Sequence, residues 1–238
     1  MESKGTLYLL PLPIAENTLE KSVSTYERNV IISLKYFIVE NIRTSRRFIS
    51  SLREGITIED LQFFEINKKT DERAISPVIK LLKEGHSVGI MSEAGCPGIA
   101  DPGAMVADLA HKNNIRVEPL SGPSSMFLAL MSSGFNGQKF EFCGYIPVKN
   151  PDRRKALLKM EGKASNENVT QIFMDTPYRN NQLLKDIINN CNPNSYLSIS
   201  CDLTGESEFI KTMQIKNWQK TEVDLHKKPA LFLFGRCL

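Results

Sequence analysis

The chain has 238 residues, enough for one large domain or two small ones with a substantial core. Hydrophobic residues make up 41% and charged residues 24%, and the formal charge of +3 permits a nucleic-acid partner without requiring one. The five cysteines include no CxxC spacing and the three histidines are scattered, which argues against a disulfide framework or a metal site and favours a reducing compartment.

The N-terminal segment MESKGTLYLLPLPIAE has a four-residue apolar run that ends at Pro11, which argues against a secretory signal. No stretch approaches the ~20 apolar residues that are needed to cross a bilayer. We therefore expect a cytoplasmic protein without a membrane partner.

In chain order, the first half alternates short apolar runs with helical patterns. Strands are predicted at residues 7–10, 36–39, 88–91 and 115–118. Helices are predicted from about Thr44 to Arg53, up to a C-terminal cap at Gly85, at 104–112, and from the segment 121–125 through Met131. The helix before Gly85 begins either at Ser76-Pro77 or near Asp71, with Pro77 as a kink. This alternation predicts a mostly parallel sheet.

The second half is less regular. Strands are predicted at 141–144, 169–174, 196–200, 209–214 and 230–235, helices at 153–160 and 180–189, and a polar loop at 162–168. Strands without a helix between them indicate a mixed sheet with antiparallel pairs. The predicted fold class is α/β, with one domain at 1–121 and a second at 122–238.

The segment SEAGCPGIADPG, at 92–103, follows the strand at 88–91 and is rich in glycine and proline. It contains neither a GKS/GKT motif nor a GxGxxG fingerprint, so it is not one of the common nucleotide loops. Asp101-Pro102 fits a helix N-cap followed by proline at the first helical position. Gly95 and Gly98 fit either a plain turn or a loop whose backbone approaches a ligand.

Two further loops of small residues follow predicted strand ends, PLPIAEN at 11–17 and LSGPSS at 120–125. The second opens a helix whose N-terminus could bind a carboxylate or phosphate, although Ser124 also fits a plain N-cap. Three such loops at the same edge of one sheet predict a shared ligand cleft.

Charged side chains supply the remaining candidates. The basic helix carries Arg43, Arg46, Arg47 and Arg53, which could simply form a solvated helix face. Phosphate contacts are the alternative, since Arg46 and Arg47 lie near the predicted helix start. The cluster Arg153-Arg154-Lys155 has the same two interpretations. Glu40, at a strand end, is either a surface carboxylate or a substrate contact.

These loops, in this order, resemble one family. EGHSVGIMSEAGCPGIADPGAMV resembles the "SDAGTPxISDPG" signature of the bacterial ribosomal RNA 2′-O-methyltransferases that modify a cytidine in the small-subunit RNA, within the tetrapyrrole-methylase-like superfamily. VENIRTSRRFI resembles "AEDTRxTRxLL", FMDTPYR resembles "YESPxR", and DLTG resembles "ELTK". GTLYLLPLPI, LSGPSSMFLALMSSGF and FEFCGYIPVKNPDRRKAL match in order as well, so the resemblance covers most of the chain.

The resemblance implies two α/β domains of the tetrapyrrole methylase type, S-adenosylmethionine in the cleft between them, no metal, a homodimer and an RNA partner. The implied cofactor contacts are Leu10, Pro11, Ser92, Glu93, Ala94, Gly95, Cys96, Ser124, Ser125, Asp175, Leu203 and Pro229. The implied substrate contacts are Arg43, Arg46 and Arg47. The catalytic base is not identified; Glu40, Arg43 and Glu93 are the candidates.

Departures from the family pattern gather at candidate substrate positions: Ala15-Glu16 replaces Gly-Asn, Asn41-Ile42 replaces Asp-Thr, Glu93 replaces Asp, Cys96 replaces Thr and Gly205 replaces Lys. The chain also ends at Leu238, where relatives commonly continue into a basic tail. The leading hypothesis is an S-adenosylmethionine-dependent methyltransferase acting on a ribose 2′-hydroxyl of small-subunit ribosomal RNA. The alternatives are a methyltransferase for another RNA or a small heterocycle, and a catalytically silent relative that binds the cofactor or RNA.

Overall fold

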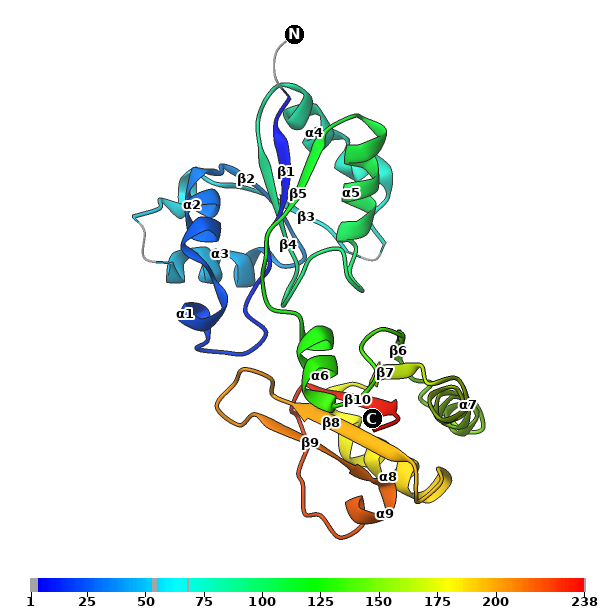
Figure 1. The fold of residues 1–238 in the computed structure, drawn as a ribbon. Helices are drawn as coiled ribbons and strands as arrows, with labels where there is room; N and C mark the ends of the chain where they lie inside the picture. The colour runs from blue at the N-terminus through cyan, green and yellow to red at the C-terminus, as the bar shows by residue number, and fades with distance from the viewer. Residues whose placement is uncertain (1–3, 53–54, 68, 238) are drawn as a thin grey trace. The chain divides into compact units, whose positions relative to one another are not determined.

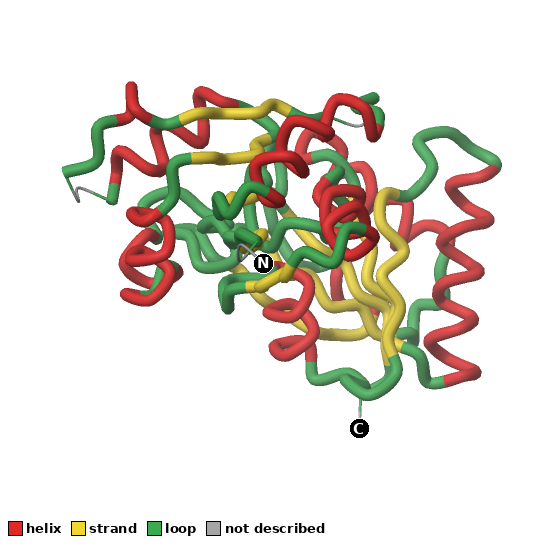
Figure 2. Tube along the Cα trace, turned by 90° about the horizontal axis from the view of Figure 1, so that it is seen from above, coloured by secondary structure: helices red, strands yellow, loops and turns green. Residues whose placement is uncertain are grey.

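The chain divides into two compact units, residues 1–124 and 125–238, each built on its own sheet. The computed structural model describes residues 4–52, 55–67 and 69–237, so Arg53 of the predicted basic helix lies outside the described residues. In both units the strands gather into sheets that helices cover (Figures 1 and 2).

The first unit contains a five-stranded sheet in which every pair of neighbours is parallel, as the sequence predicted. Its order is β3-β2-β4-β1-β5, with β1 at Thr6–Leu9, β2 at Tyr36–Val39, β3 at Gln62–Glu65, β4 at Val88–Met91 and β5 at Arg116–Pro119. The middle strand, β4, is buried at all four positions because helices cover both faces of the sheet.

Helices pack on both faces of this sheet (Figure 1). They are α1 (Leu19–Ser22), α2 (Thr25–Ser33), α3 (Ile42–Ser51), α4 (Glu72–Lys83) and α5 (Gly103–Lys112), with a 3-10 turn at Ile58–Asp60. The apolar sides of α2 and α3 form one core with Phe37 and Met91, and those of α4 and α5 form another with Ile38 and Ile90. The unit is therefore a three-layer α/β sandwich.

The helix starts show which capping signals operated. Asp71 caps α4 by accepting a hydrogen bond from the Ala74 N–H, so this helix begins at the earlier of the two predicted places and Pro77 lies inside it. Pro102 directly precedes α5 with a helical φ of −70°, and the Asp101 carboxylate accepts a hydrogen bond from the Gly103 N–H at 2.6 Å, which is the capping bond predicted for Asp101.

The second unit contains a mixed sheet of order β6-β7-β10-β8-β9, which confirms the prediction. The strands are β6 (Phe140–Tyr145), β7 (Thr170–Met174), β8 (Tyr196–Cys201), β9 (Phe209–Gln214) and β10 (Ala230–Gly235). Only the β6–β7 pair is parallel among the named strands; the other neighbours are antiparallel.

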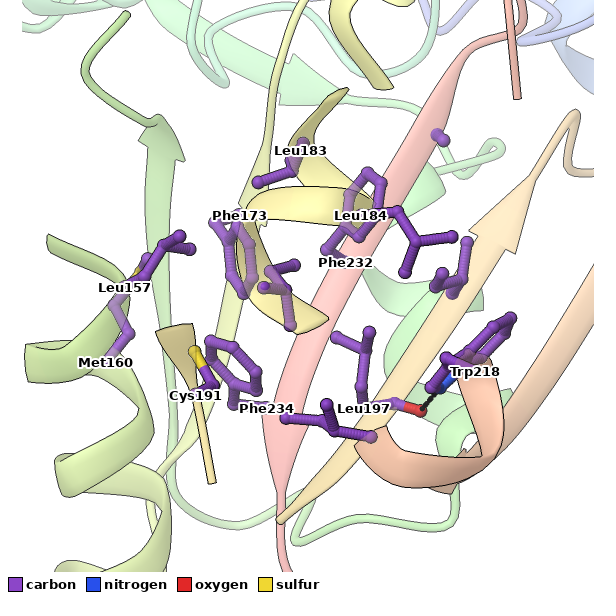
Figure 3. Packing of buried hydrophobic residues seen from close by; sticks show 14 of the residues in the cluster. Leu157, Met160, Phe173, Leu183, Leu184, Cys191, Leu197, Trp218, Phe232 and Phe234 are labelled. Atoms are coloured by element: carbon purple, nitrogen blue, oxygen red, sulfur yellow. Dashed lines mark hydrogen bonds between the residues drawn. The ribbon is translucent and has the colours of Figure 1, made fainter. Parts of the chain in front are cut away.

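Four helices and a 3-10 turn accompany this sheet: α6 (Ser125–Ser133), α7 (Asp152–Glu167), the turn Pro177–Arg179, α8 (Asn180–Asn190) and α9 (Ile215–Trp218). Leu157 and Met160 of α7 and Leu183 of α8 point into a core around Phe173 and Phe232 (Figure 3). The Trp218 indole donates to the Leu197 carbonyl.

The polar loop predicted at 162–168 was wrong, because α7 continues to Glu167. Ala164 is buried at the position one turn after Met160, so packing against the sheet extends the helix through a polar stretch. Asn168 then ends the helix in the left-handed conformation, which asparagine tolerates.

Candidate active site

The carboxyl ends of β1 and β4 mark the place where a ligand would bind in the first sheet. These strands are neighbours, but the chain leaves β1 toward β2 on one side and leaves β4 toward β5 on the other. In open α/β sheets ligands bind at such a reversal of direction, because the two departing loops leave a crevice between them.

Three loops converge at this point. The Leu12 N–H donates to the Gly95 carbonyl at 2.9 Å, and the Gly95 N–H donates back to the Leu12 carbonyl at 3.0 Å. A Cβ added to Gly122 would lie 2.2 Å from Pro11, so the third loop can approach the first only with glycine there. The structure thus brings together Pro11, Gly95 and the loop before α6, all of which the sequence marked as small-residue loops.

The loop at 92–103 has two parts with different bonding. In its second part the Asp101 carboxylate accepts from the N–H groups of Gly98 and Gly103, at 2.9 and 2.6 Å, which closes the loop on itself. In its first part the buried Ser92 hydroxyl donates to the Ala94 carbonyl, and the Cys96 thiol faces the Pro123 carbonyl at 3.4 Å. The second part is therefore a structural turn. In the first part, residues 92–96, the contacts of Ser92 and Cys96 hold the loop in place beside the other two loops.

Two carboxylates meet at the ends of β2 and β4. The Glu93 N–H donates to Glu40 Oε1 at 3.2 Å, and Thr44 Oγ1 lies 3.5 Å from Glu93 Oε1. Asn41, which stands where the family pattern has Asp, caps α3 by accepting from the Arg43 and Thr44 N–H groups. The structure therefore places the catalytic candidates Glu40 and Glu93 side by side, with Arg43 in the adjoining first turn of α3.

The three arginines that were predicted as substrate contacts lie on α3, but not all near its start. The helix begins at Ile42, so Arg43 is in the first turn while Arg46 and Arg47 are in the second, which corrects the predicted placement. All three are exposed. The Arg46 guanidinium lies 5.5 Å from the centre of the Phe63 ring, a cation–π contact, whereas Arg43 and Arg47 share one helix face at i,i+4 spacing.

Glu27 on α2 was not identified from the sequence, although the pattern Ser-x-x-Glu at 24–27 is a capping-box signal. Its side chain is fully buried, and neither carboxyl oxygen has a hydrogen-bond partner among the described residues. Burial raises the pKa of the Glu27 carboxyl group to about 7, and the Ser24 backbone lowers it by a smaller amount. Burial also raises the pKa of the Cys96 thiol, and the Glu27 charge raises it further, so Glu27 lies electrostatically close to the converging loops.

A hollow of about 620 Å³ adjoins these loops within the first unit. Its lining is mostly apolar and includes Pro11, Cys96, Ala104, Ala107 and Leu120, with His111 among the polar groups. Both the size and the apolar lining are typical of small-molecule sites.

The second-unit candidates form a cluster of their own at one end of the second sheet. Asp175 follows β7, Leu203 follows β8 and Pro229 precedes β10, and the Asp202 N–H donates to the Pro229 carbonyl at 2.9 Å. Of the two serines marked in the sequence, Ser124 belongs to the first unit and Ser125 begins α6 in the second.

The Asp175 carboxylate is fully buried in an ion-pair network. Arg153 Nη1 and Arg179 Nη2 lie 2.8 and 2.7 Å from its oxygens, and Arg153 Nε also pairs with Asp186 at 2.6 Å. Burial alone would raise the pKa of Asp175, but the hydrogen bonds from Arg179 and Arg153 outweigh it and hold the pKa below its usual range. Arg153 is thus a buried structural cation, not part of a solvated basic cluster, and the Asp175 carboxylate is occupied by its arginine partners.

The loop from β8 to β9 holds its backbone in unusual conformations. Asp202 and Thr204 both have positive φ angles, +49° and +69°. This conformation is strained for Thr204, because its side chain is β-branched. A Cβ on Gly205 would lie 2.6 Å or less from the Asp202 carboxylate oxygens, so any side chain at this position would require that carboxylate to shift.

Within residues 4–52, 55–67 and 69–237, no His, Cys, Asp or Glu side chains gather in a group of three that suits a metal ion. No helix of the described chain combines the length and the apolarity that spanning a bilayer requires.

Comparison with known proteins places this geometry in context. The chain is 30% identical over 214 residues to the ribosomal RNA small subunit methyltransferase I of Halalkalibacterium halodurans, covering 88% of this chain and 68% of that protein. The proteins of the same name from Buchnera aphidicola subsp. Schizaphis graminum and Escherichia coli O157:H7 are 29% and 27% identical, covering 98% and 87% of this chain and 79% and 68% of theirs. No protein-family model matches the chain.

Solved structures share the fold at low sequence identity. The methyltransferase CobJ superposes with a TM-score of 0.61 at 15% identity, covering 98% of this chain and 94% of that chain. A uroporphyrin III C-methyltransferase from Thermus thermophilus gives a TM-score of 0.57 at 14% identity and covers 98% of both chains. These neighbours show a tetrapyrrole methylase fold.

Proposed function

The chain belongs to the ribosomal RNA small subunit methyltransferase I family and is a methyltransferase, and we propose that it transfers a methyl group from S-adenosylmethionine to a ribose 2′-hydroxyl of small-subunit ribosomal RNA. The observation that carries the proposal is the convergence of the loops at 10–15, 92–96 and 120–124 on one apolar hollow. A binding site for a small molecule is what this arrangement offers.

The residues of the first unit fit S-adenosylmethionine. The hollow beside Pro11 and Cys96 is large enough for an adenosyl group, and its apolar wall suits a purine ring. Gly95 has a φ of +70°, a conformation that a residue with a side chain would resist, and this lets its N–H and C=O pair with Leu12 and hold the first two loops together. The bound cofactor would supply an electrophilic methyl group on sulfur.

The chain must then hold the acceptor oxygen in line with that methyl group, and such positioning can supply several kcal/mol of the activation free energy. A ribose hydroxyl is a weak nucleophile, so an adjacent carboxylate would help by accepting its proton. We assign this role to Glu93, which is exposed and stands next to the converging loops. Glu40 acts as a positioning residue, because its carboxylate holds the Glu93 N–H.

Arg43 and Arg47 present guanidinium groups on one face of α3, next to Glu93, and are proposed to contact RNA phosphates. The family resemblance also supports a homodimer that acts in the cytoplasm. Light scattering of the purified protein tests the first of these statements, and localisation of a tagged chain tests the second.

Labelled methyl transfer to small ribosomal subunits that lack the modification is the direct test. We expect radiolabel in the RNA, at a ribose position that resists alkaline cleavage of the chain. Calorimetry with S-adenosylhomocysteine provides the matched binding measurement, and absence of binding at millimolar ligand would overturn the proposal.

The same pair of measurements separates the alternatives. Cofactor binding with label in another RNA or in a small heterocycle would indicate a different acceptor. Cofactor binding without label in any acceptor would indicate a silent relative, an interpretation that the changes at Glu16 and Asn41 favour.

A further inference from the structure

A second hollow lies in the second unit, between the edge strand β6 and helix α7, and we call it the β6–α7 hollow. Its volume is about 360 Å³, within the range of ligand sites. β6 is the outermost strand of its sheet and carries a bulge between Phe142 and Gly144. A bulge at a sheet edge changes the direction of the side chains beside it, and the hollow lies between this part of β6 and α7.

The lining combines aromatic and basic side chains. Phe142, Tyr145 and Met160 contribute apolar surface, and Lys159 and Lys163 contribute positive charge. Tyr145 is 61% exposed, so its ring is available for stacking. Aromatic rings beside lysines are the combination by which proteins hold single-stranded nucleic acid, since bases stack on the rings and phosphates pair with the cations.

The charges of the hollow do not cancel. The charged side chains of the lining are Lys159, Lys163 and Glu141, so its net charge is 2 − 1 = +1. Lys163 pairs with Glu141 at 2.7 Å, whereas Lys159 forms no ion pair within 4.0 Å among the described residues. Lys155, one turn earlier, continues the row at i,i+4 spacing, so the three lysines start from backbone positions separated by about 6 Å along α7.

The remaining polar groups favour reversible binding. Burial raises the pKa of the Cys143 thiol to about 11, and the Glu141 charge adds to this, so the thiol stays protonated and unreactive at neutral pH. Gln171, 1% exposed, donates one Nε2 hydrogen to the Val169 carbonyl. Its side chain also hydrogen-bonds the Glu141 carboxylate, so this amide supports the lining of the hollow.

We propose that the β6–α7 hollow binds one unstacked base of single-stranded RNA, with Lys155 and Lys159 pairing with the phosphates that flank it. This inference rests on the proposed RNA substrate and adds a contact surface on the second unit, separate from the α3 arginines of the first.

The test is fluorescence anisotropy with a labelled single-stranded RNA of roughly 12 nucleotides. Lys159→Glu should weaken binding by about tenfold, and its log–log salt dependence should become shallower by about 0.7 for each lost phosphate contact. The matched control is Lys185→Glu, an equal charge change at an exposed position of α8 away from the hollow, which should weaken binding by less than about threefold.

A second variant tests the base rather than the phosphates. Ala156 lines the hollow, and Ala156→Trp should fill it and weaken binding without changing the salt dependence. Calorimetry with S-adenosylhomocysteine and far-ultraviolet circular dichroism verify that each variant is folded.

Equal affinities for wild type, Lys159→Glu and Ala156→Trp would overturn the inference, as would an equal loss in Lys159→Glu and Lys185→Glu. In those cases methyl transfer by the wild type would leave the proposed function standing. A wild type that neither binds nor methylates RNA would overturn both.

Discussion

Replacing Glu27 with glutamine should stabilise the first unit at neutral and alkaline pH. The buried carboxyl group has a pKa of about 7 in the folded protein, against 4.5 for an ordinary glutamate, because burial disfavours its charged form. The folded state therefore binds the proton more tightly than the unfolded chain does. Below the unfolded pKa the carboxyl group is protonated in both states, so its ionisation costs no stability. The stability of the unit then falls as the pH rises from about 4.5 to about 7.

The magnitude follows from the two pKa values. Their difference corresponds to at most about 3 kcal/mol of unfolding free energy, which is fully lost above about pH 7. Glutamine has nearly the same shape and cannot ionise, so Glu27→Gln should recover most of this free energy at about pH 8 and little of it at about pH 4.5.

The assay must report on the first unit alone. Trp218 belongs to the second unit and is the single tryptophan of the chain, so its fluorescence in a urea titration follows the second unit and serves as an internal control. Hydrogen exchange of the β1, β2 and β4 amides, compared at about pH 5 and about pH 8 after correction for intrinsic rates, follows the first unit. If wild type and Glu27→Gln show the same pH dependence there, the carboxyl group is not desolvated as described and the reasoning fails.

Four further predictions concern the site and the contacts that support it. Arg153→Met should lower the unfolding free energy of the second unit by roughly 3–5 kcal/mol, because it leaves the buried Asp175 carboxylate short of a partner. A urea titration followed by Trp218 fluorescence measures this loss. A loss no larger than that of the control Arg154→Met, at an exposed position, would contradict the prediction. The stability supplied by the lowered pKa of Asp175 is present above its unfolded value of 3.8 and is lost as the pH falls. Asn41→Ala should lower the unfolding free energy by about 1 kcal/mol and speed hydrogen exchange in the first turn of α3, because the helix cap is lost. Asn41→Asp should retain the cap, and equal amide exchange rates in the two variants would contradict this. Glu93→Gln should lower kcat for methyl transfer by roughly 10²-fold with unchanged S-adenosylhomocysteine affinity, and an undiminished kcat would remove Glu93 from the chemistry.

Local patterns were sufficient for much of the fold. The predicted strands at 36–39, 88–91, 209–214 and 230–235 have the observed bounds, because each is a short run of strand-forming residues between clear breaks. The helix α2 and the edge strand β3 were not predicted. β3 has only four residues and none of them is fully buried, so it lacks the apolar run that marks an interior strand.

For the candidate site, the sequence located the loops but not their bonding. Gly95 and Gly122 stand out because glycine in a loop after a strand signals an unusual backbone, and both positions do require it. The pairing of Glu40 with the Glu93 N–H joins residues 53 positions apart, and no local pattern contains that information.

By itself, the sequence determined the α/β class, the parallel and mixed sheets and the family, since these depend on periodicity, breakers and the order of motifs. Only the tertiary structure decided which charged groups are buried and which face solvent. Glu27 and Arg153 look like ordinary surface residues in the sequence, yet both are buried. The Glu27 carboxyl oxygens have no hydrogen-bond partner in the described part of the chain, and the Arg153 guanidinium lies between two aspartates. The ionisation of a carboxyl group depends on the water and charges around it, and those are set by segments that meet only when the chain folds.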